Sequence, residues 1–125
     1  MRERILLADD NTSLLTALKR LLNLSYTVVS TVRTGADVLE AARVLQPDVI
    51  VIDVRLPDIN GLVVCRQVTA AVPHARVVVL TAVDDPVVEQ RAFEAGAAAF
   101  VLKYRAGDDL IPAIERALAT RMPAP

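Results

Sequence analysis

The stretch DVIVIDVRLPDING, from Asp48 to Gly61, decides the fold. Five of the six residues from Val49 to Val54 are Val or Ile, a composition typical of a strand buried on both faces of a parallel sheet. The sixth residue is Asp53. Because burying an unpaired carboxylate is costly, such a side chain normally needs a partner or a metal ion. The stretch therefore predicts a central strand and raises the question of what Asp53 does.

Four further apolar runs follow the same pattern, and each is rich in Val, Ile or Leu, as buried strands require. The segments between the runs carry apolar residues at helical spacing. The expected strands are Arg4–Ala8, Tyr26–Val32, Val49–Val54, Arg76–Leu80 and Ala98–Leu102. The expected helices lie around residues 14–22, over Gly35–Leu45, Gly61–Ala71 and Pro86–Ala95, and around residues 110–118.

Five β–α units in a row predict an α/β fold, with a parallel sheet covered by helices on both faces and right-handed crossovers. The 125 residues are enough for one domain with a single core. Hydrophobic residues make up 54% of the chain but aromatic residues only 3%, so the core must be aliphatic. We expect the domain to span residues 1–121, with residues 122–125 as a linker or disordered tail.

Acidic residues mark the expected starts of two helices. Asp84 or Asp85 is a candidate cap for the fourth helix. Asp108 or Asp109 is the candidate cap for the last helix, which would leave Pro112 in the first turn, where proline is tolerated.

Charge and composition exclude several classes of protein. The formal net charge is -1, from 14 basic and 15 acidic residues, so there is no general attraction to nucleic acid or to anionic lipid. The single cysteine, Cys65, rules out an internal disulfide. No apolar stretch approaches the roughly 20 residues of a membrane helix. We therefore expect a cytoplasmic domain with no membrane partner.

Polar and charged residues lie at the carboxyl ends of four expected strands. They are Asp9 and Asp10 after the first, Asp53 in the third, Thr81 and Ala82 after the fourth, and Lys103 after the fifth. A parallel sheet brings all of these ends to one edge, where ligand sites form at the topological switch point. We therefore expect one crevice that holds three carboxylates, a hydroxyl and an ammonium group.

Three carboxylates at close quarters repel one another, and a hard divalent cation is the simplest remedy. Mg²⁺ prefers oxygen ligands and is often shared with a phosphate oxygen. Lys103 can bind a phosphoryl oxygen, and Thr81 and the Ala82 backbone N–H can donate hydrogen bonds. Since a carboxylate can be the nucleophile that forms an acyl phosphate, the set predicts that an aspartate accepts a phosphoryl group. Asp53 is the best candidate because it lies on the middle strand.

The chain resembles a known family, the receiver domains of two-component response regulators. The matching stretches are ILLADDN, VIVIDVRLPDINGL, VVVLTA and GAAAFVLK, in this order. The pattern is most similar to receivers attached to LuxR-type helix-turn-helix effectors. The resemblance implies a flavodoxin-like, doubly wound sheet of five parallel strands in the order 2-1-3-4-5, with five helices.

The resemblance also implies a role for each candidate residue. Asp53 is the expected phosphoacceptor, with Thr81 and Lys103 as the other catalytic residues. The expected Mg²⁺ ligands are Asp9, Asp10, Asp53 and the backbone carbonyl of Arg55. The expected phosphoryl-binding groups are those of Thr81, Ala82 and Lys103. The expected switch residues are Thr81 and Phe100.

The implied function is signalling rather than metabolic catalysis. A sensor histidine kinase would donate the phosphoryl group, and the domain would catalyse only its own phosphotransfer and autodephosphorylation. The output would be homodimerisation on phosphorylation, or control of transcription through an effector beyond residue 125. DNA would be contacted only through that effector.

Two positions depart from the most common receiver pattern. Many receivers have a cis proline after the conserved-type lysine, but this chain has Tyr104. Because a cis bond to a non-proline residue costs about 2.5–4 kcal/mol, we predict a trans bond. Arg55 and Val83 occupy the two variable positions that flank the site and tune dephosphorylation in the family.

Three alternatives remain open at this stage. A phosphatase that forms an aspartyl phosphate needs a second aspartate two positions after the nucleophile, where this chain has Arg55. A flavodoxin needs a Ser/Thr/Gly-rich loop after the first strand, where Asp9 and Asp10 would repel the flavin phosphate. A stand-alone or phosphate-independent receiver that acts as a docking module is the third.

Overall fold

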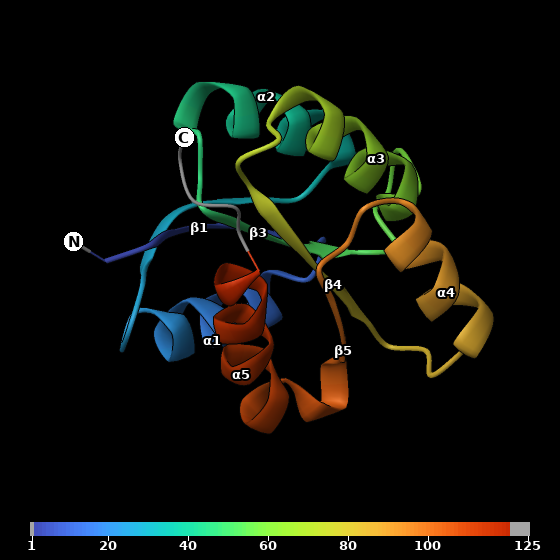
Figure 1. The fold of residues 1–125 in the computed structure, drawn as a ribbon. Helices are drawn as coiled ribbons and strands as arrows, with labels where there is room; N and C mark the ends of the chain where they lie inside the picture. The colour runs from blue at the N-terminus through green and yellow to red at the C-terminus, as the bar shows by residue number, and fades with distance from the viewer. Residues whose placement is uncertain (1, 121–125) are drawn as a thin grey trace.

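The computed structural model describes residues 2–120 and shows a three-layer α/β domain (Figure 1). All strand pairs of its five-stranded sheet are parallel, in the order β2-β1-β3-β4-β5. The strands are β1 (Arg4–Ala8), β2 (Thr27–Val32), β3 (Val49–Asp53), β4 (Arg76–Thr81) and β5 (Ala99–Leu102). The helices are α1 (Thr12–Leu22), α2 (Gly35–Leu45), α3 (Gly61–Ala71), α4 (Pro86–Glu94) and α5 (Ala106–Ala119). The predicted fold and strand order are confirmed.

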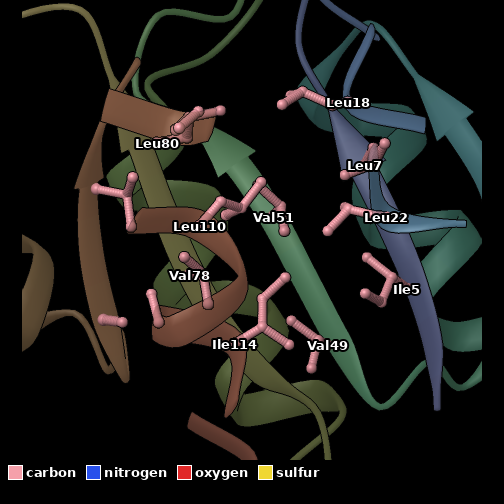
Figure 2. Close-up of a cluster of buried hydrophobic side chains, with 14 of the residues drawn as sticks. Ile5, Leu7, Leu18, Leu22, Val49, Val51, Val78, Leu80, Leu110 and Ile114 are labelled. Atoms are coloured by element: carbon pink, nitrogen blue, oxygen red, sulfur yellow. The ribbon is translucent and has the colours of Figure 1, made fainter. Parts of the chain in front are cut away.

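The two faces of the sheet carry separate aliphatic clusters. Side chains alternate between faces along each strand, so Ile5 and Leu7 join one cluster and Leu6 and Ala8 the other. The first cluster packs against α1 and α5, and Figure 2 shows the side chains of Leu110 of α5 and of Leu18 and Leu22 of α1 among those of the strands. The second packs against α2, α3 and α4, which lie on the opposite side of the sheet in Figure 1. All five residues of β3 are buried, as expected for the central strand.

Short polar side chains start four of the helices. The side chains of Asn11, Thr34, Asn60 and Asp85 each accept a hydrogen bond from a backbone N–H in the first turn that follows. Of the two residues predicted as candidate caps for α4, the structure confirms Asp85. At the other end of α4, Gly96 has a φ of 104°, a left-handed conformation that glycine adopts without strain.

The start of the last helix differs from the prediction. A 3₁₀ turn over Lys103–Arg105 runs directly into α5, which begins at Ala106. Neither Asp108 nor Asp109 is therefore a cap; both lie in the first turn. The carboxylates instead face Arg105, whose guanidinium lies 3.7 Å from Asp108 and 3.2 Å from Asp109. An ion pair with the preceding arginine thus replaces the expected cap.

Because α5 starts earlier than expected, Pro112 lies inside the helix rather than in its first turn. Proline removes one helical N–H donor, and its side chain here is exposed to solvent. The remaining strand and helix ends differ from the expected ones by at most one residue, except that α1 begins at Thr12, two residues before the expected start. The predicted linker, residues 122–125, lies outside the described residues, as does Arg121, at the end of the predicted domain.

Within the described part of the chain, no helix is long and apolar enough to cross a membrane.

Helix α4 buries fewer residues than the other α-helices. Ala92 is its one buried residue, whereas every other α-helix buries at least three. Val87 and Phe93 are about half exposed on its surface. An element with so few buried apolar contacts opens or shifts at lower free energy than the core.

Candidate functional site

The register of the sheet brings the candidate residues to one edge. Ala8 pairs with Ile52, so Asp9 follows at the level of Asp53. Asp53 pairs with Leu80, and Thr81 lies one residue further along the neighbouring strand. Thr81 in turn pairs with Leu102, the residue before Lys103. Strands β1, β3, β4 and β5 thus each present a polar residue at their carboxyl ends.

Three carboxylates form the centre of this site. One oxygen atom from each of Asp9, Asp10 and Asp53 lies within 4.8 Å of the others. Asp9 and Asp53 are buried, with 1% and 3% of their surface exposed, whereas Asp10 is open to solvent. The cluster predicted from sequence is therefore assembled, with two members withdrawn from water and one at the entrance.

Lys103 reaches across the sheet edge to the two buried carboxylates. Its Nζ atom lies 2.8 Å from Oδ2 of Asp9 and 3.1 Å from Oδ2 of Asp53. It donates a hydrogen bond to Asp53, but its approach to Asp9 is close without hydrogen-bond geometry. Oδ2 of Asp9 is therefore a buried oxygen atom with no hydrogen bond within residues 2–120. One cation is shared by two buried anions.

The single positive charge of Lys103 does not fully offset the burial and mutual repulsion of the two carboxylates. Burial raises the pKa of Asp53 and the charge of Asp9 raises it further, against the lowering effects of the Arg55 N–H and of Lys103. Burial alone would lower the pKa of Lys103, but its contacts with Asp9 and Asp53 outweigh burial and raise it. A simple ion pair would lower the pKa of its carboxyl group. The opposite direction at Asp53 reflects its burial and the second carboxylate beside it.

The loop after β3 folds back tightly on the site. The backbone N–H of Arg55 donates to Oδ1 of Asp53 over 3.2 Å, which fixes the orientation of that carboxylate. Arg55 also forms an isolated antiparallel bridge with Asn60, and the Gly61 N–H donates to the Val54 carbonyl over 2.8 Å. A Cβ atom on Gly61 would clash with the backbone carbonyl of Asp53, so only glycine fits at this return point.

The other candidate residues lie around this centre. Thr81 is buried, and its hydroxyl accepts a hydrogen bond from the Val83 N–H over 3.3 Å. Ala82 is exposed beside it. Phe100 is half-buried on β5 and packs on the cluster that also contacts α4. The bond from Lys103 to Tyr104 is trans, as predicted, because no cis peptide bond occurs in the described part of the chain.

Two contributors were missed by the sequence analysis. Asn11, two residues after Asp9, donates its backbone N–H to Oδ1 of Asp9 over 2.9 Å and also caps α1. Asp58 accepts hydrogen bonds from the N–H groups of Gly35 and Ala36, at 2.7 and 3.0 Å. An Asn three residues before the apolar helical pattern that begins at Leu14 could have indicated Asn11 as a cap. Nothing local indicates the contact of Asp58, because its partners lie 23 and 22 residues earlier.

The residues present fit a hard divalent cation. The donors are carboxylate oxygens, which Mg²⁺ prefers, and they converge within a few ångströms. The buried Oδ2 atom of Asp9 lacks a hydrogen bond, and Lys103 is the one cation in contact with Asp9 and Asp53 among the described residues. Burying such an oxygen is costly unless a positive charge compensates for it. Asp9, Asp10 and Asp53 are thus a chemically reasonable ligand set.

The fold and the acidic edge define a class of protein, and the comparison with protein families agrees. The chain belongs to the response regulator receiver domain family, whose model matches residues 5–115. Receivers are signalling domains of two-component systems that are phosphorylated by histidine kinases and bind Mg²⁺ at an acidic aspartate cluster. The family resemblance inferred from the sequence motifs is confirmed.

Individual relatives place the chain more closely within the family. It is 31% identical over 113 residues to the transcriptional regulatory protein LnrK of Bacillus subtilis, covering 89% of this chain and 51% of LnrK. It is 32% identical over 118 residues to the response regulator GacA of Pseudomonas aeruginosa, covering 93% of this chain and 55% of GacA. The chain therefore spans about half the length of these curated relatives.

Solved structures show the same fold over nearly the whole chain. A LuxR-family response regulator from Aurantimonas has a TM-score of 0.91 and 30% identity, covering 97% of this chain and 88% of that one. The receiver domain assigned to NarL of Mycobacterium tuberculosis has a TM-score of 0.89 and 30% identity, covering 96% and 98%. The predicted similarity to receivers of LuxR-family regulators is thus confirmed.

Proposed function

We propose that this chain is a phosphoacceptor switch in which Asp53 takes a phosphoryl group from a histidine kinase. The observation that carries the proposal is the convergence of Asp9, Asp10, Asp53 and Lys103 at one edge of the sheet. An acidic site with a single lysine suits an anionic ligand that arrives together with a divalent cation. A phosphoryl group and Mg²⁺ are such a pair.

The chemistry follows from the positions of these groups. An oxygen atom of Asp53 attacks the phosphorus atom of the kinase phosphohistidine, so that a P–O bond forms while the P–N bond breaks. The leaving imidazole nitrogen is then protonated from solvent. Lys103 moves from Asp53 to a phosphoryl oxygen, and the Thr81 hydroxyl and the Ala82 N–H donate to the others.

The metal would be held by the three carboxylates and by the backbone carbonyl of Arg55. When bound, Mg²⁺ supplies positive charge that stabilises the phosphoryl oxygens during transfer. The hydrogen bond from the Arg55 N–H keeps the Asp53 carboxylate in one orientation, so that its second oxygen faces Lys103. The only reactions catalysed are the domain's own phosphotransfer and autodephosphorylation.

The response would pass through the face formed by α4, β5 and α5. Movement of Thr81 towards the phosphoryl group lets Phe100 follow, which biases an equilibrium between two surface arrangements. The sparse burial of α4 supports this route, because Ala92 is its one buried residue. The output would be homodimerisation in the cytoplasm and control of transcription, with DNA contacted through an effector domain beyond residue 125. LnrK, to which the chain is 31% identical, is a transcriptional regulatory protein, and this similarity supports that output.

Phosphorylation by a small-molecule acyl phosphate tests the proposal directly. The wild type, Asp53→Asn and the matched control Asp37→Asn are incubated with the donor, with and without Mg²⁺, and analysed by intact mass. One phosphoryl adduct should form in the wild type and in Asp37→Asn only with Mg²⁺, and none in Asp53→Asn. Asp37 is a suitable control because it is an exposed aspartate on α2.

Size exclusion of the same samples tests the output. A shift to a larger species that coincides with the adduct would support dimerisation. An unlabelled wild type, under conditions that label another receiver, would contradict the phosphoacceptor role. A phosphate-independent docking module would then be the surviving function.

A further inference from the structure

The loop between β3 and α3 is tied to the start of α2 by one side chain, Asp58. Its Oδ1 atom accepts from the Gly35 N–H over 2.7 Å and its Oδ2 atom from the Ala36 N–H over 3.0 Å. Both hydrogen bonds hold the charged form of the carboxyl group, so they lower the pKa of Asp58. The carboxylate also lies at a helix N-terminus, where the helix dipole favours negative charge.

Asp58 adds hydrogen-bond acceptors to the start of a helix that already has a cap. Thr34 already caps α2, because its hydroxyl accepts from the Asp37 N–H over 3.2 Å. Asp58 adds acceptors for the two N–H groups before Asp37, from a loop more than 20 residues away. Gly35 lets the loop approach closely, since a Cβ atom there would clash with the Ile59 side chain. The two hydrogen bonds of Asp58 and the close approach at Gly35 thus hold the middle of the loop against α2.

The same loop holds the candidate phosphoacceptor in place. Its first residues carry the Arg55 N–H that donates to Asp53, and the Arg55–Asn60 bridge joins its two ends. Asp58 lies between these two ends, in the middle part of the loop from Val54 to Asn60. A contact that holds the middle of such a short loop restricts the positions that both ends can take.

We propose that Asp58 is a positioning residue for the phosphoryl and metal site. By tying the loop to α2, it holds the Arg55 backbone in the position that orients the Asp53 carboxylate. The inference rests on the proposed function, because it concerns the same site. Asp58 itself touches neither the phosphoryl group nor the metal.

Mg²⁺ affinity separates positioning from mere capping. The variants are Asp58→Ala, which removes both acceptors, Asp58→Asn, which keeps the shape and one acceptor, and the control Asp37→Asn on the same helix end. Titration calorimetry measures the Kd for Mg²⁺, and urea unfolding measures stability. Asp58→Ala should weaken Mg²⁺ binding roughly 10-fold, as outer residues that orient metal ligands do. Asp58→Asn should be intermediate and Asp37→Asn unchanged.

Amide exchange in the wild type gives a second test that needs no variant to fold. If the tie favours Mg²⁺ binding, Mg²⁺ must strengthen the tie by the same factor, because coupling between two sites is reciprocal. The Gly35 and Ala36 amides should therefore exchange more slowly with Mg²⁺. The Val87 amide, capped by Asp85 on α4, should not change.

The outcomes distinguish this inference from the proposed function. If Asp58→Ala loses stability but binds Mg²⁺ like the wild type, and the Gly35 and Ala36 amides ignore Mg²⁺, Asp58 is only a cap and the inference is wrong. If the wild type binds no Mg²⁺ at all, the proposed metal site fails, and the inference fails with it.

Discussion

The Nζ atom of Lys103 lies 3.1 Å from Oδ2 of Asp53, at the ends of two strands that are separated by β4. The same atom lies 2.8 Å from Asp9, so one lysine holds two buried carboxylates together. Lys103 is thus the counter-ion of both carboxylates. The stability of the domain and the occupancy of its site are therefore linked through this side chain.

Removing the lysine should destabilise the domain in a way that Mg²⁺ can correct. Lys103→Met leaves Asp9 and Asp53 buried without their cation, which we expect to lower the free energy of unfolding by about 3 kcal/mol in the presence of a chelator. Because a ligand that binds the native state stabilises it by mass action, millimolar Mg²⁺ should restore more stability to this variant than to the wild type. Urea unfolding with and without Mg²⁺ measures both effects.

Lys19→Met is the matched control, since Lys19 is an exposed lysine on α1. Its unfolding should be close to that of the wild type under both conditions. Equal Mg²⁺ stabilisation of Lys103→Met and the wild type would show that Lys103 does not compensate the acidic cluster.

Neutralising Asp53 should have the opposite effect on stability. Burial and the charge of Asp9 raise the pKa of Asp53 above its ordinary value, so the folded state binds the proton of this carboxyl group more tightly than the unfolded state does. The ionised form therefore destabilises the fold at neutral pH, and this penalty disappears as the pH falls below the ordinary pKa. Asp53→Asn removes the charge while Lys103 keeps Asp9, so we expect a gain of about 1 kcal/mol at pH 7 without Mg²⁺.

Urea unfolding at neutral and acidic pH checks the sign of this prediction. The gain should shrink at acidic pH, and saturating Mg²⁺ should reverse it if Asp53 is a metal ligand as proposed. Asp37→Asn should show no comparable gain. A less stable Asp53→Asn at pH 7 in chelator would mean that the Lys103 contact outweighs burial.

The strands and the acidic edge could be predicted from the sequence because they depend on local composition and on topology. Residues 49–52 are apolar enough to be buried on both faces, and parallel strands must align their carboxyl ends. The start of α5 could not be predicted in this way. Asp108 and Asp109 have the right composition for caps, but Arg105 pairs with both, and the helix begins before them.

The tie between Asp58 and α2 marks the limit of such reasoning. Asp58 follows Pro57 and has the composition of an ordinary turn, and the start of α2 already has Thr34 as a cap. Its contact with Gly35 exists only once the sheet has brought the β2–α2 and β3–α3 connections together. Local patterns carry no information about contacts of this kind.

Gly61 offers a sharp test of the packing beneath the site. A Cβ atom there would clash with the Asp53 backbone carbonyl, which cannot move without disturbing β3. We expect Gly61→Ala to lower the free energy of unfolding by about 3 kcal/mol, as overpacking against fixed atoms does. Gly107→Ala is the matched control, because nothing lies within 4 Å of a Cβ atom at that position in α5.

The control should instead gain about 0.5–1 kcal/mol, since alanine is favoured over glycine within a helix. Urea unfolding of the two variants beside the wild type measures the contrast. Equal effects of the two substitutions would show that the loop after β3 has room to move away from Asp53.

Cys65 provides a probe of the opposite side of the sheet from α1 and α5. Burial raises the pKa of its thiol from 9.0 to about 11, and the nearby Arg66 charge only partly opposes this. The unfolded chain therefore ionises its thiol at a lower pH than the folded one, so the thiol's contribution to stability is lost as the pH rises from about 9 towards 11. Across that window the free energy of unfolding of the wild type should fall faster than that of Cys65→Ala, by up to about 1.4 kcal/mol per pH unit. Urea unfolding of both proteins from pH 7 to 11 measures the difference, and parallel curves would mean that the thiol reaches solvent in the native state.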